Sequence, residues 1–445
     1  MTSLFGTSGI RGPAKTPFTD QFCFDIGRTF AKFLDNHNQV GKIAVGNDPR
    51  ESSPRIKKFF IEGLLSEDRS VFDEGVTPVS SLNWILIASD FVASTMVTGS
   101  HIKADYNGLK FFAFRQEILK EHEAEIEKIY NEIKEKVLVP QKTSEVPQED
   151  KARQLYIKML TGMIKKPYPL KRMVVDPGNG SQTGVITKVL EETGIEIIPI
   201  NNSLSNGFLA RDTEMERDFE EIKNKVKAEG ADLGVGYDAD GDRIVFIDES
   251  GRFVPPEYAC SIIAKYEEGD VVVTPITVSQ VVEYTGKRVV RTKVGSPYVV
   301  GKMQEVGASF GFEANGGSIF SRYMLTRDGG IPTIKMLNLM RDKSKSMSQL
   351  VNEFPKFYIF KDKVECPWEL ELRVLQEARK NFKGVKTEEV DGLKIWVSPD
   401  SWVIFRTSRN SPEFRVFAES KTEDDARNLV ENGIKLVKGV IAHGS

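Results

Sequence analysis

The sequence predicts an α/β protein that consists of three α/β domains with mixed sheets and a smaller C-terminal α+β domain. Short β-branched runs alternate with amphipathic stretches along most of the chain, which is typical of βαβ units. The C-terminal part instead places three short strands before one helix. A length of 445 residues fits several domains of about 150 residues each. The expected domains are residues 1–150, 151–252, 253–358 and 359–445.

The first domain should contain strands at residues 42–46 and 91–98, with a helix over residues 54–65 between them. Residues 117–137 carry isoleucines at helical spacing among charged residues, so we expect a helix with one buried face. The proline-containing segment 140–150 indicates a surface connection to the next domain.

The second domain should begin with a strand at residues 173–175 and a turn at Gly178 and Gly180. It should close with two apolar runs, residues 231–237 and 244–248, that bracket an acidic loop. The third domain is expected to contain strands at residues 271–273, 288–293 and 308–312 and a helix at residues 331–341. The C-terminal domain should comprise a hairpin of residues 393–397 and 402–405, a strand at 413–418 and a helix at 423–440.

The charges of the chain are nearly balanced, with 61 Lys and Arg against 64 Asp and Glu. No basic block provides the electrostatic footprint that nucleic acid or an anionic membrane requires, so neither is an expected partner. The sequence shows no apolar run of membrane-spanning length and no signal-peptide pattern, and we expect a cytoplasmic protein. Three scattered cysteines and four scattered histidines argue against zinc and a disulfide framework.

The strongest chemical motif is the acidic loop of residues 238–243. Asp238, Asp240 and Asp242 alternate along it, and three carboxylates in a tight turn offer the hard oxygen ligands that Mg²⁺ prefers. Arg243 would repel a bare cation, which indicates that a phosphate completes the site. A solvated acidic turn is the simpler alternative, but flanking strands would hold this loop, and metal binding is favoured.

A second motif places Ser100 and His101 at the end of an expected strand, with Lys110 shortly after them. The serine hydroxyl could be a phosphoryl or acyl nucleophile, and Lys110 could supply charge to a phosphate or act as a base. No Gly-x-Ser-x-Gly elbow surrounds Ser100, however. Taken alone, this motif is more typical of side chains that only hydrogen-bond at the strand end.

Two further loops carry groups that suit sugar phosphates. Residues 406–415 combine three arginines with hydroxyls and an amide, a set of donors of the right size for a phosphomonoester. A basic surface loop is an equally good interpretation of this segment by itself. Residues 311–317 leave a strand into a flexible turn that offers Glu313 and Asn315 to sugar hydroxyls, which is a weak signal alone.

Together these motifs resemble those of the α-D-phosphohexomutase superfamily, the phosphoglucomutase/phosphomannomutase and phosphoglucosamine mutase enzymes, and the resemblance covers the full chain. Residues 5–12 look like the family's opening motif and residues 98–110 like its active-serine motif. The metal, sugar-binding and phosphate-binding loops would be residues 238–243, 313–317 and 406–415. The segments 292–295 and 327–329 look more like archaeal members than bacterial ones.

The resemblance implies four domains around a central cleft and a phosphoryl group that moves between the 1- and 6-positions of a hexose phosphate. Ser100 would be carried as phosphoserine and, with Asp238, Asp240 and Asp242, would hold one Mg²⁺ per chain. A bisphosphorylated sugar would be the intermediate, and hexose 1,6-bisphosphate the activator. The substrate would be a glucose, mannose or glucosamine phosphate, and the chain could act as a monomer or a homo-oligomer.

The resemblance also assigns roles to individual residues. The implied catalytic residues are Ser100, His101, Lys110, Arg11 and Arg243. The implied substrate-binding residues are Glu313, Asn315, Thr292, Gly295 and Arg327. The implied ligands of the non-reacting phosphate are Arg406, Ser408, Asn410 and Arg415.

Two of these loops depart from the family pattern. Ile102-Lys103 stands where Asn-Pro usually follows the Ser-His pair, and four positions of the usual Arg-Pro-Ser-Gly-Thr-Glu-Pro loop differ after Arg406. These changes leave open a sugar-phosphate-binding paralogue with little or no turnover. An enzyme that forms a phosphoaspartate on Asp238 is a further alternative, but it would explain neither the Ser100 motif nor the arginine loop.

Overall fold

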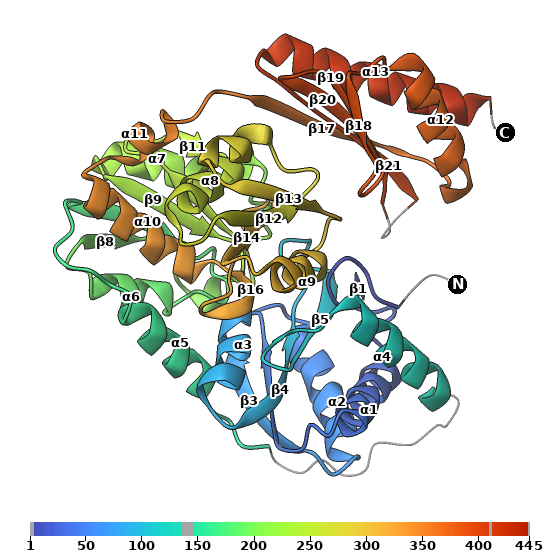
Figure 1. The fold of residues 1–445 in the computed structure, drawn as a ribbon. Coiled ribbons are helices and arrows are strands. Elements are labelled where there is room, and N and C mark those ends of the chain that lie inside the picture. Colours follow the sequence, from blue (N-terminus) through green and yellow to red (C-terminus); the bar gives the residue numbers. More distant parts are fainter. Residues whose placement is uncertain (1–3, 135–145, 409–411, 444–445) are drawn as a thin grey trace.

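The computed structural model describes residues 4–134, 146–408 and 412–443 (Figure 1). These residues form one sheet of eleven strands and two sheets of five strands. In Figure 1 the C-terminal part lies at the upper right, beside the rest of the molecule. Among the described residues, no helix combines the length and apolar character that crossing a membrane requires.

The first domain contributes strands β1–β6 to the large sheet. Its strands are β1 (Ile10–Pro13), β2 (Lys42–Asn47), β3 (Ser70–Val76), β4 (Phe91–Val97), β5 (Tyr106–Ala113) and β6 (Gln116–Glu117). Its helices are α1 (Asp20–Asn36), α2 (Ser53–Leu65), α3 (Val79–Ala88) and α4 (Lys120–Ile133). Ile43 and Val45 of β2 pack with α1 and α2, whereas Ala44 packs with α3. Helices therefore cover both faces of this strand, which explains its continuous apolar run.

The expected helix over residues 117–137 begins later than predicted. Glu117 pairs with β5 as part of β6, and α4 starts only at Lys120. Ile118 is buried but precedes the helix, so the periodic isoleucines continue past the true boundary. Residues 135–137 lie outside the described part of the chain.

Helices α1 and α2 cross at two glycines that let their backbones touch. A Cβ atom on Gly27 would lie 2.1 Å from the carbonyl oxygen of Phe60, and one on Gly63 would lie 2.0 Å from that of Phe24. Neither carbonyl can move without shifting its helix. The close approach of the two helices therefore requires both glycines.

We expect Gly27→Ala to destabilise the protein by about 1–3 kcal/mol, because the added methyl group forces the two backbones apart. The matched control is Gly301→Ala in the helix Ser296–Val306, where an added Cβ would meet nothing within 4 Å. That change should be neutral or stabilise the helix by about 0.5–1 kcal/mol. Thermal unfolding checks both, and equal melting temperatures for the two variants would contradict the packing argument.

The second domain forms a separate sheet with the strand order β11-β10-β9-β7-β8. Its strands are β7 (Arg172–Asp176), β8 (Glu196–Pro199), β9 (Leu233–Tyr237), β10 (Ile244–Ile247) and β11 (Phe253–Val254). Its helices are α5 (Lys151–Thr161), α6 (Ile186–Glu191) and α7 (Glu220–Glu229). β9 and β10 form an antiparallel pair, so the acidic loop is held between two strands as predicted.

The third domain continues the sheet of the first. Its strands are β12 (Val271–Pro275), β13 (Arg288–Thr292), β14 (Phe310–Phe312), β15 (Ser318–Phe320) and β16 (Met324–Asp328). Its helices are α8 (Pro256–Tyr266), α9 (Ser296–Val306), α10 (Gly330–Lys343) and α11 (Met347–Val351). β16 pairs in parallel with β6, where Leu325 lies opposite Gln116. The predicted active-serine motif and the predicted sugar-binding loop are therefore attached to one continuous sheet.

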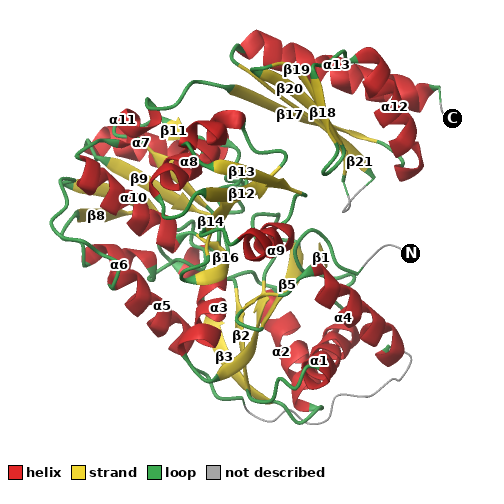
Figure 2. Cartoon of the chain, in the orientation of Figure 1, coloured by secondary structure: helices red, strands yellow, loops and turns green. Residues whose placement is uncertain are grey.

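The C-terminal domain is a five-stranded antiparallel sheet with helices on one face (Figure 2). Its strands are β17 (Tyr358–Glu365), β18 (Lys386–Glu388), β19 (Leu393–Ser398), β20 (Ser401–Thr407) and β21 (Glu413–Ser420). Its helices are α12 (Glu371–Asn381) and α13 (Glu423–Ala442). Three α/β domains and a C-terminal α+β domain confirm the predicted fold class.

The second face of the C-terminal sheet packs against the third domain. Val403 and Phe405 of β20 point into the core beneath α12 and α13. Their neighbours Trp402 and Ile404 point the other way and pack on Ile276, which follows β12. Because side chains alternate along a strand, β20 can bury both of its faces.

Candidate active site

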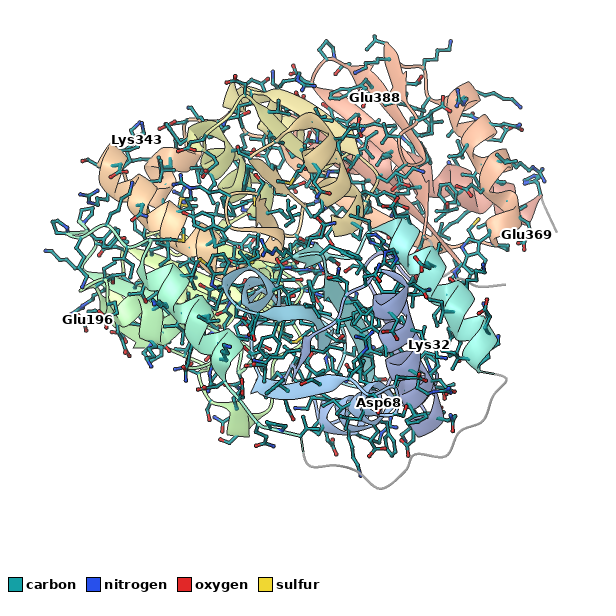
Figure 3. The ribbon with its side chains drawn as sticks, turned by 60° about the horizontal axis from the view of Figure 1, so that its bottom comes forward. Lys32, Asp68, Glu196, Lys343, Glu369 and Glu388 are labelled. Carbon is teal, nitrogen blue, oxygen red and sulfur yellow. The ribbon has the colours of Figure 1, made fainter. Side chains whose placement is uncertain are left out.

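Ionisable side chains lie mainly on the outside of the molecule, but several groups of them are buried, and one of these groups is the acidic loop. Figure 3 shows charged side chains such as those of Glu196, Lys343 and Glu369 at the periphery. In contrast, Asp238 and Asp240 have no exposed surface. Charges are buried at such a cost only where they are paired or used, so this group is the candidate active site.

The acidic loop between β9 and β10 offers the oxygen atoms of a metal site. One carboxylate oxygen from each of Asp238, Asp240 and Asp242 lies within 4.8 Å of the other two. The Oδ1 atoms of Asp240 and Asp242 are buried and have no hydrogen-bond partner. Lys110 Nζ donates hydrogen bonds to the second carboxylate oxygen of both residues, at 2.6 Å to Asp240 Oδ2 and at 2.7 Å to Asp242 Oδ2. Unpaired buried carboxylate oxygens in this arrangement fit a hard divalent cation.

The pKa values of this loop show how strongly its charges interact. Burial, together with Asp240 and Asp242, raises the pKa of Asp238 well above its usual value. Burial acts on Asp242 too, but Arg327, Lys110 and Arg243 overcome it and hold the pKa of Asp242 below its usual range. Three carboxylates this close repel one another, and added positive charge relieves that repulsion.

Ser100 lies directly against this loop. Its Oγ donates a hydrogen bond of 3.0 Å to Asp238 Oδ2, although the two residues are 138 positions apart. The backbone of Ser100 has a φ of +52°, a left-handed conformation that is unusual for serine. Burial, then Arg243 and Arg11, lower the pKa of the neighbouring His101 well below its usual value, so its ring stays neutral.

Three arginines from separate elements complete the charged centre. Arg11 lies on β1 opposite Gly108, and burial and Arg243 lower its pKa to about 10. Arg243 Nε lies 3.7 Å from Asp238 Oδ2. Arg327, at the end of β16, contacts Asp242 Oδ2 at 2.9 Å. All the residues expected to be catalytic are therefore gathered around the acidic loop.

The predicted sugar-binding loop joins this centre through Arg327. Arg327 Nη1 contacts Oε2 of Glu313, the residue directly after β14, at 2.8 Å. Asn315 shapes the turn itself, because its Oδ1 accepts a hydrogen bond of 3.0 Å from the backbone N–H of Gly317. Thr292 and Gly295 lie apart from that turn, at the end of β13 and before α9.

Two arginines of the predicted phosphate-binding loop face each other across neighbouring strands. Arg406 on β20 lies opposite Arg415 on β21. Arg406 Nε contacts Asp391 Oδ2 at 2.6 Å, and the same oxygen accepts a hydrogen bond of 3.1 Å from the N–H of Val294. Asp391 thus ties this loop to the segment that contains Thr292 and Gly295. Ser408 is buried in the same loop, whereas the predicted ligand Asn410 lies outside the described residues.

The structure adds residues that the sequence did not reveal. Glu117 accepts hydrogen bonds from Ser8 Oγ at 2.5 Å and Ser296 Oγ at 2.7 Å, and so joins the first and third domains. Glu214 of the second domain pairs with Lys361 of the C-terminal domain and interacts with both Arg243 and Arg415. These carboxylates are isolated charges in the sequence, where no spacing marks them.

Comparison with known proteins identifies the family of this chain. Three family models match the chain, namely domains I, II and III of phosphoglucomutase/phosphomannomutase, at residues 2–137, 154–251 and 256–358. A phosphoglucomutase/phosphomannomutase of Thermococcus kodakarensis is 34% identical over 98% of this chain and 99% of its own length. The chain belongs to the phosphoglucomutase/phosphomannomutase family. The resemblance inferred from its motifs is confirmed, and with it the enzyme class, an intramolecular phosphotransferase of the isomerase type.

Other members of the family match over a similar length. A phosphoglucosamine/phosphogalactosamine mutase of Sulfurisphaera tokodaii is 31% identical over 99% of this chain and 100% of its own. A family protein from Burkholderia thailandensis has the same fold, with a TM-score of 0.84 at 21% identity, over 99% of this chain and 98% of its own. An N-acetylphosphoglucosamine mutase of Aspergillus fumigatus, solved with GlcNAc-6P and magnesium, has a TM-score of 0.63 at 13% identity over 98% and 96%.

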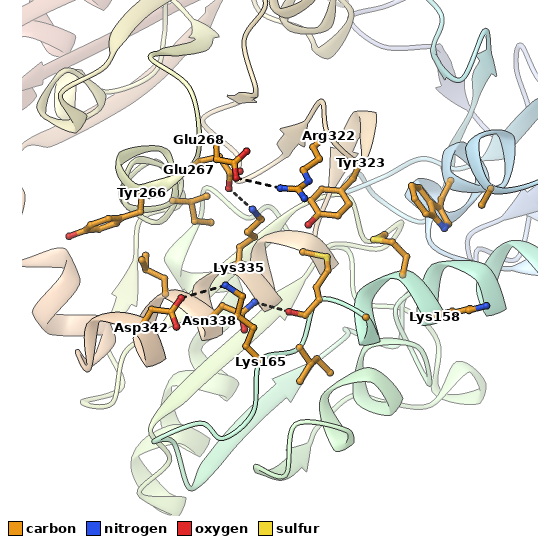
Figure 4. Close-up of a pocket in the computed structure, with 18 of the residues that line it drawn as sticks. Lys158, Lys165, Tyr266, Glu267, Glu268, Arg322, Tyr323, Lys335, Asn338 and Asp342 are labelled. Carbon is orange, nitrogen blue, oxygen red and sulfur yellow. Dashed lines mark hydrogen bonds and ion pairs between the residues drawn. The ribbon is translucent and has the colours of Figure 1, made fainter.

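A recess of about 870 Å³ lies away from the charged centre, between α5, α8 and α10 (Figure 4). Its charged side chains neutralise one another, as in the pairs Lys335–Glu267 at 2.7 Å and Lys165–Asp342 at 3.6 Å. None of the site residues described above lines it. This recess is therefore separate from the candidate active site described above.

Proposed function

We propose that this family member interconverts hexose 1-phosphates and 6-phosphates through a phosphoserine at Ser100. The observation that carries the proposal is the hydrogen bond between Ser100 Oγ and Asp238, which places a buried hydroxyl on a three-carboxylate loop. Phosphoryl transfer depends mainly on positioning and charge stabilisation, and this centre offers both.

In the proposed cycle the phosphoserine gives its phosphoryl group to the free hydroxyl of a hexose phosphate. A new P–O bond forms to the sugar while the bond to Ser100 Oγ breaks, and the proton lost by the sugar hydroxyl is balanced by the proton that Oγ takes up. The bisphosphorylated sugar then turns over. Its other phosphoryl group returns to Oγ, which releases the isomeric monophosphate and restores the phosphoserine.

The proposed roles follow from the contacts of each side chain. Asp238, Asp240 and Asp242, with a phosphoserine oxygen, would hold Mg²⁺, which neutralises charge that develops on the phosphoryl oxygens. Lys110 and the guanidinium groups of Arg11 and Arg243 lie around the same point and stabilise that charge further. His101 stays neutral and can hydrogen-bond to the phosphoryl group without adding charge.

The remaining predicted residues would bind the rest of the substrate. We assign binding of the sugar hydroxyls to Glu313 and Asn315. Arg327 would orient Glu313. Thr292 and Gly295 would make further contacts with the substrate. The non-reacting phosphate would bind Arg406, Ser408, Asn410 and Arg415. Burial and the facing Arg406 lower the pKa of Arg415, and an anion between the two guanidinium groups would relieve their repulsion.

The choice of sugar is tested by a coupled assay for 1-phosphate to 6-phosphate conversion. Glucose, mannose and glucosamine phosphates are compared, since relatives at about 30% identity carry names that refer to each of these or to related sugars. Catalytic glucose 1,6-bisphosphate primes the phosphoserine. Turnover of at least one sugar supports the proposal, whereas binding of glucose 6-phosphate without turnover of any sugar supports a binding paralogue.

We expect Arg415→Ala to weaken the forward and reverse reactions alike. The two phosphates of the intermediate exchange places, so the same loop meets the substrate in both orientations. Loss of one charge-assisted contact costs about 1.5–3 kcal/mol, or roughly tenfold to a hundredfold in kcat/KM. Most of the loss should appear in KM, because the phosphate is held in ground and transition states alike.

The matched control for this change is Arg427→Ala. Arg427 is an arginine on α13 of the same domain that pairs with Glu423 at 2.9 Å, outside the loop. Its removal should leave KM unchanged. Steady-state kinetics in both directions would contradict the proposed role of Arg415 if only one direction were affected.

A further inference from the structure

The guanidinium group of Arg50 is buried beneath the loop that follows Ser100. Arg50 has only 1% of its surface exposed. Its Nη2 donates hydrogen bonds to the carbonyl oxygens of Ser100 at 2.5 Å and Ile102 at 2.7 Å. Its Nη1 donates to those of Lys103 at 2.5 Å and Tyr106 at 3.2 Å. One side chain thus binds four main-chain carbonyls within seven consecutive residues, 100–106.

Asp48 orients this guanidinium and holds the start of the same loop. Asp48 Oδ2 accepts a hydrogen bond of 2.9 Å from Arg50 Nε and one of 2.7 Å from Thr98 Oγ1. Thr98 Oγ1 in turn accepts a hydrogen bond of 2.7 Å from the N–H of Ser100. The backbone N–H donor and the carbonyl acceptor of Ser100 therefore both lead to one ion pair, Asp48–Arg50.

Local geometry shows how closely the loop is fitted to Arg50. A Cβ atom on Gly99 would lie 2.6 Å from Arg50 Cζ, so a side chain at this position would force the guanidinium out of its place. Phe208 of the second domain covers the other side of the guanidinium, with its ring centre 4.5 Å from Cζ. Ser100 itself adopts the left-handed conformation, which persists only where the surroundings determine it strongly.

The loop has few other restraints. Residues 100–105 form neither helix nor strand, and they contain no proline that would fix a backbone angle. The backbone–backbone hydrogen bonds of the loop residues are Ile102 N–H to Gly99 O at 3.4 Å, Tyr106 N–H to Lys103 O at 3.1 Å and Ala14 N–H to Asp105 O at 2.7 Å. The contacts of Arg50 are more numerous than these.

We propose that Arg50, oriented by Asp48, is a positioning residue that fixes the backbone of residues 100–106 and thereby aims Ser100 Oγ at the acidic loop. This inference rests on the proposed function of Ser100. Arg50 donates its hydrogen bonds to the backbone and to Asp48, and it contacts no reacting atom. A small displacement of a reacting group reduces the rate of reaction strongly, so the effect of Arg50 belongs to the chemical step.

The first test is Arg50→Lys, which keeps the positive charge but loses the planar fork that reaches four carbonyls. We expect kcat to fall by roughly tenfold to a hundredfold, with KM changed by less than about threefold. Hydrogen exchange of the amides of residues 100–106 should become faster by about tenfold or more. A merely structural role would lower the melting temperature without this division between kcat and KM.

The matched control is Arg69→Lys in the same domain. Arg69 is buried and also binds main-chain carbonyls, those of Gln39 at 2.9 Å and Ala31 at 2.7 Å, away from Ser100. It should lower the melting temperature and leave kcat and the exchange of residues 100–106 as in the native protein. Equal loss of kcat in the Arg50 and Arg69 variants would overturn the proposal.

A second variant covers the case in which Arg50→Lys does not fold. Phe208→Leu removes the aromatic ring over the guanidinium and leaves its hydrogen-bonding groups in place. Faster exchange at residues 100–106 in this variant supports the positioning role, and unchanged exchange overturns it. Hydrogen exchange does not depend on turnover. If the native protein converts none of the three sugar phosphates, the proposed function fails while the exchange data still decide whether Arg50 restrains the loop.

Discussion

Ser100→Ala should leave a folded protein that has lost nearly all phosphohexomutase turnover, by about 10⁴-fold or more. The loss is this large because Oγ is the atom that both donates and accepts the phosphoryl group in the proposed cycle. The fold should survive, since the change removes one hydroxyl whose described contact is a 3.0 Å hydrogen bond to Asp238. Ser94→Ala is the matched control, because Ser94 is a buried serine on β4, the strand that precedes Ser100, and it donates a hydrogen bond to the carbonyl of Leu82.

Intact-mass measurement and peptide mapping test the phosphoserine independently of turnover. The native protein, primed with glucose 1,6-bisphosphate, should carry one phosphate at Ser100, and the variant should carry none. A phosphoserine resists hydroxylamine, whereas an acyl phosphate on Asp238 is cleaved by it. Phosphate on Asp238, or an active Ser100→Ala protein, would refute the phosphoserine mechanism.

Asp240→Asn should reduce turnover by roughly a hundredfold or more and weaken the response to Mg²⁺. Asparagine has nearly the shape of aspartate but lacks its charge, so the change removes a third of the carboxylate charge of the loop. It also leaves Lys110 with fewer acceptors, as Lys110 Nζ contacts Asp240 Oδ2 at 2.6 Å. Excess chelator should abolish activity in the native protein, and added Mg²⁺ should restore it.

Asp248→Asn controls for the loss of a buried carboxylate close to the loop. Asp248 follows β10 and binds Ser250 Oγ at 2.7 Å and Arg252 Nε at 2.8 Å, away from the metal cluster. Its variant should keep the native dependence on Mg²⁺. Full activity of the native protein in excess chelator would show that the three aspartates do not serve a catalytic metal.

The strands and helices that the sequence predicted are ones that local patterns determine, whereas elements such as α1, β3 and α9 were not predicted. Short apolar runs predicted β2, β4, β9 and β10, and the periodic apolar face of residues 423–440 predicted α13. The start of α4 was wrong, since strand pairing of Glu117 with β5 depends on a partner that the local pattern does not contain. Tertiary pairing thus set the boundary.

The composition of the active site was predictable, but its geometry was not. Each motif indicated a chemical group at a strand end, and the family resemblance indicated that the motifs belong together. No local pattern gives the 3.0 Å contact between Ser100 and Asp238. Asp391 and Glu117 went unnoticed for a related reason, because each acts through partners that are distant in the sequence.

The pairing of β6 with β16 also determines the order in which the chain can fold. Leu325 reaches Gln116 only after some two hundred intervening residues have left the ribosome. Until then the edge of the first domain's sheet stays open to solvent, and an open edge can pair with another chain. The strand at that edge, β6, has only two residues. So short a strand offers few backbone hydrogen-bonding groups to another chain. This limits aggregation of the nascent chain until β16 has been synthesised.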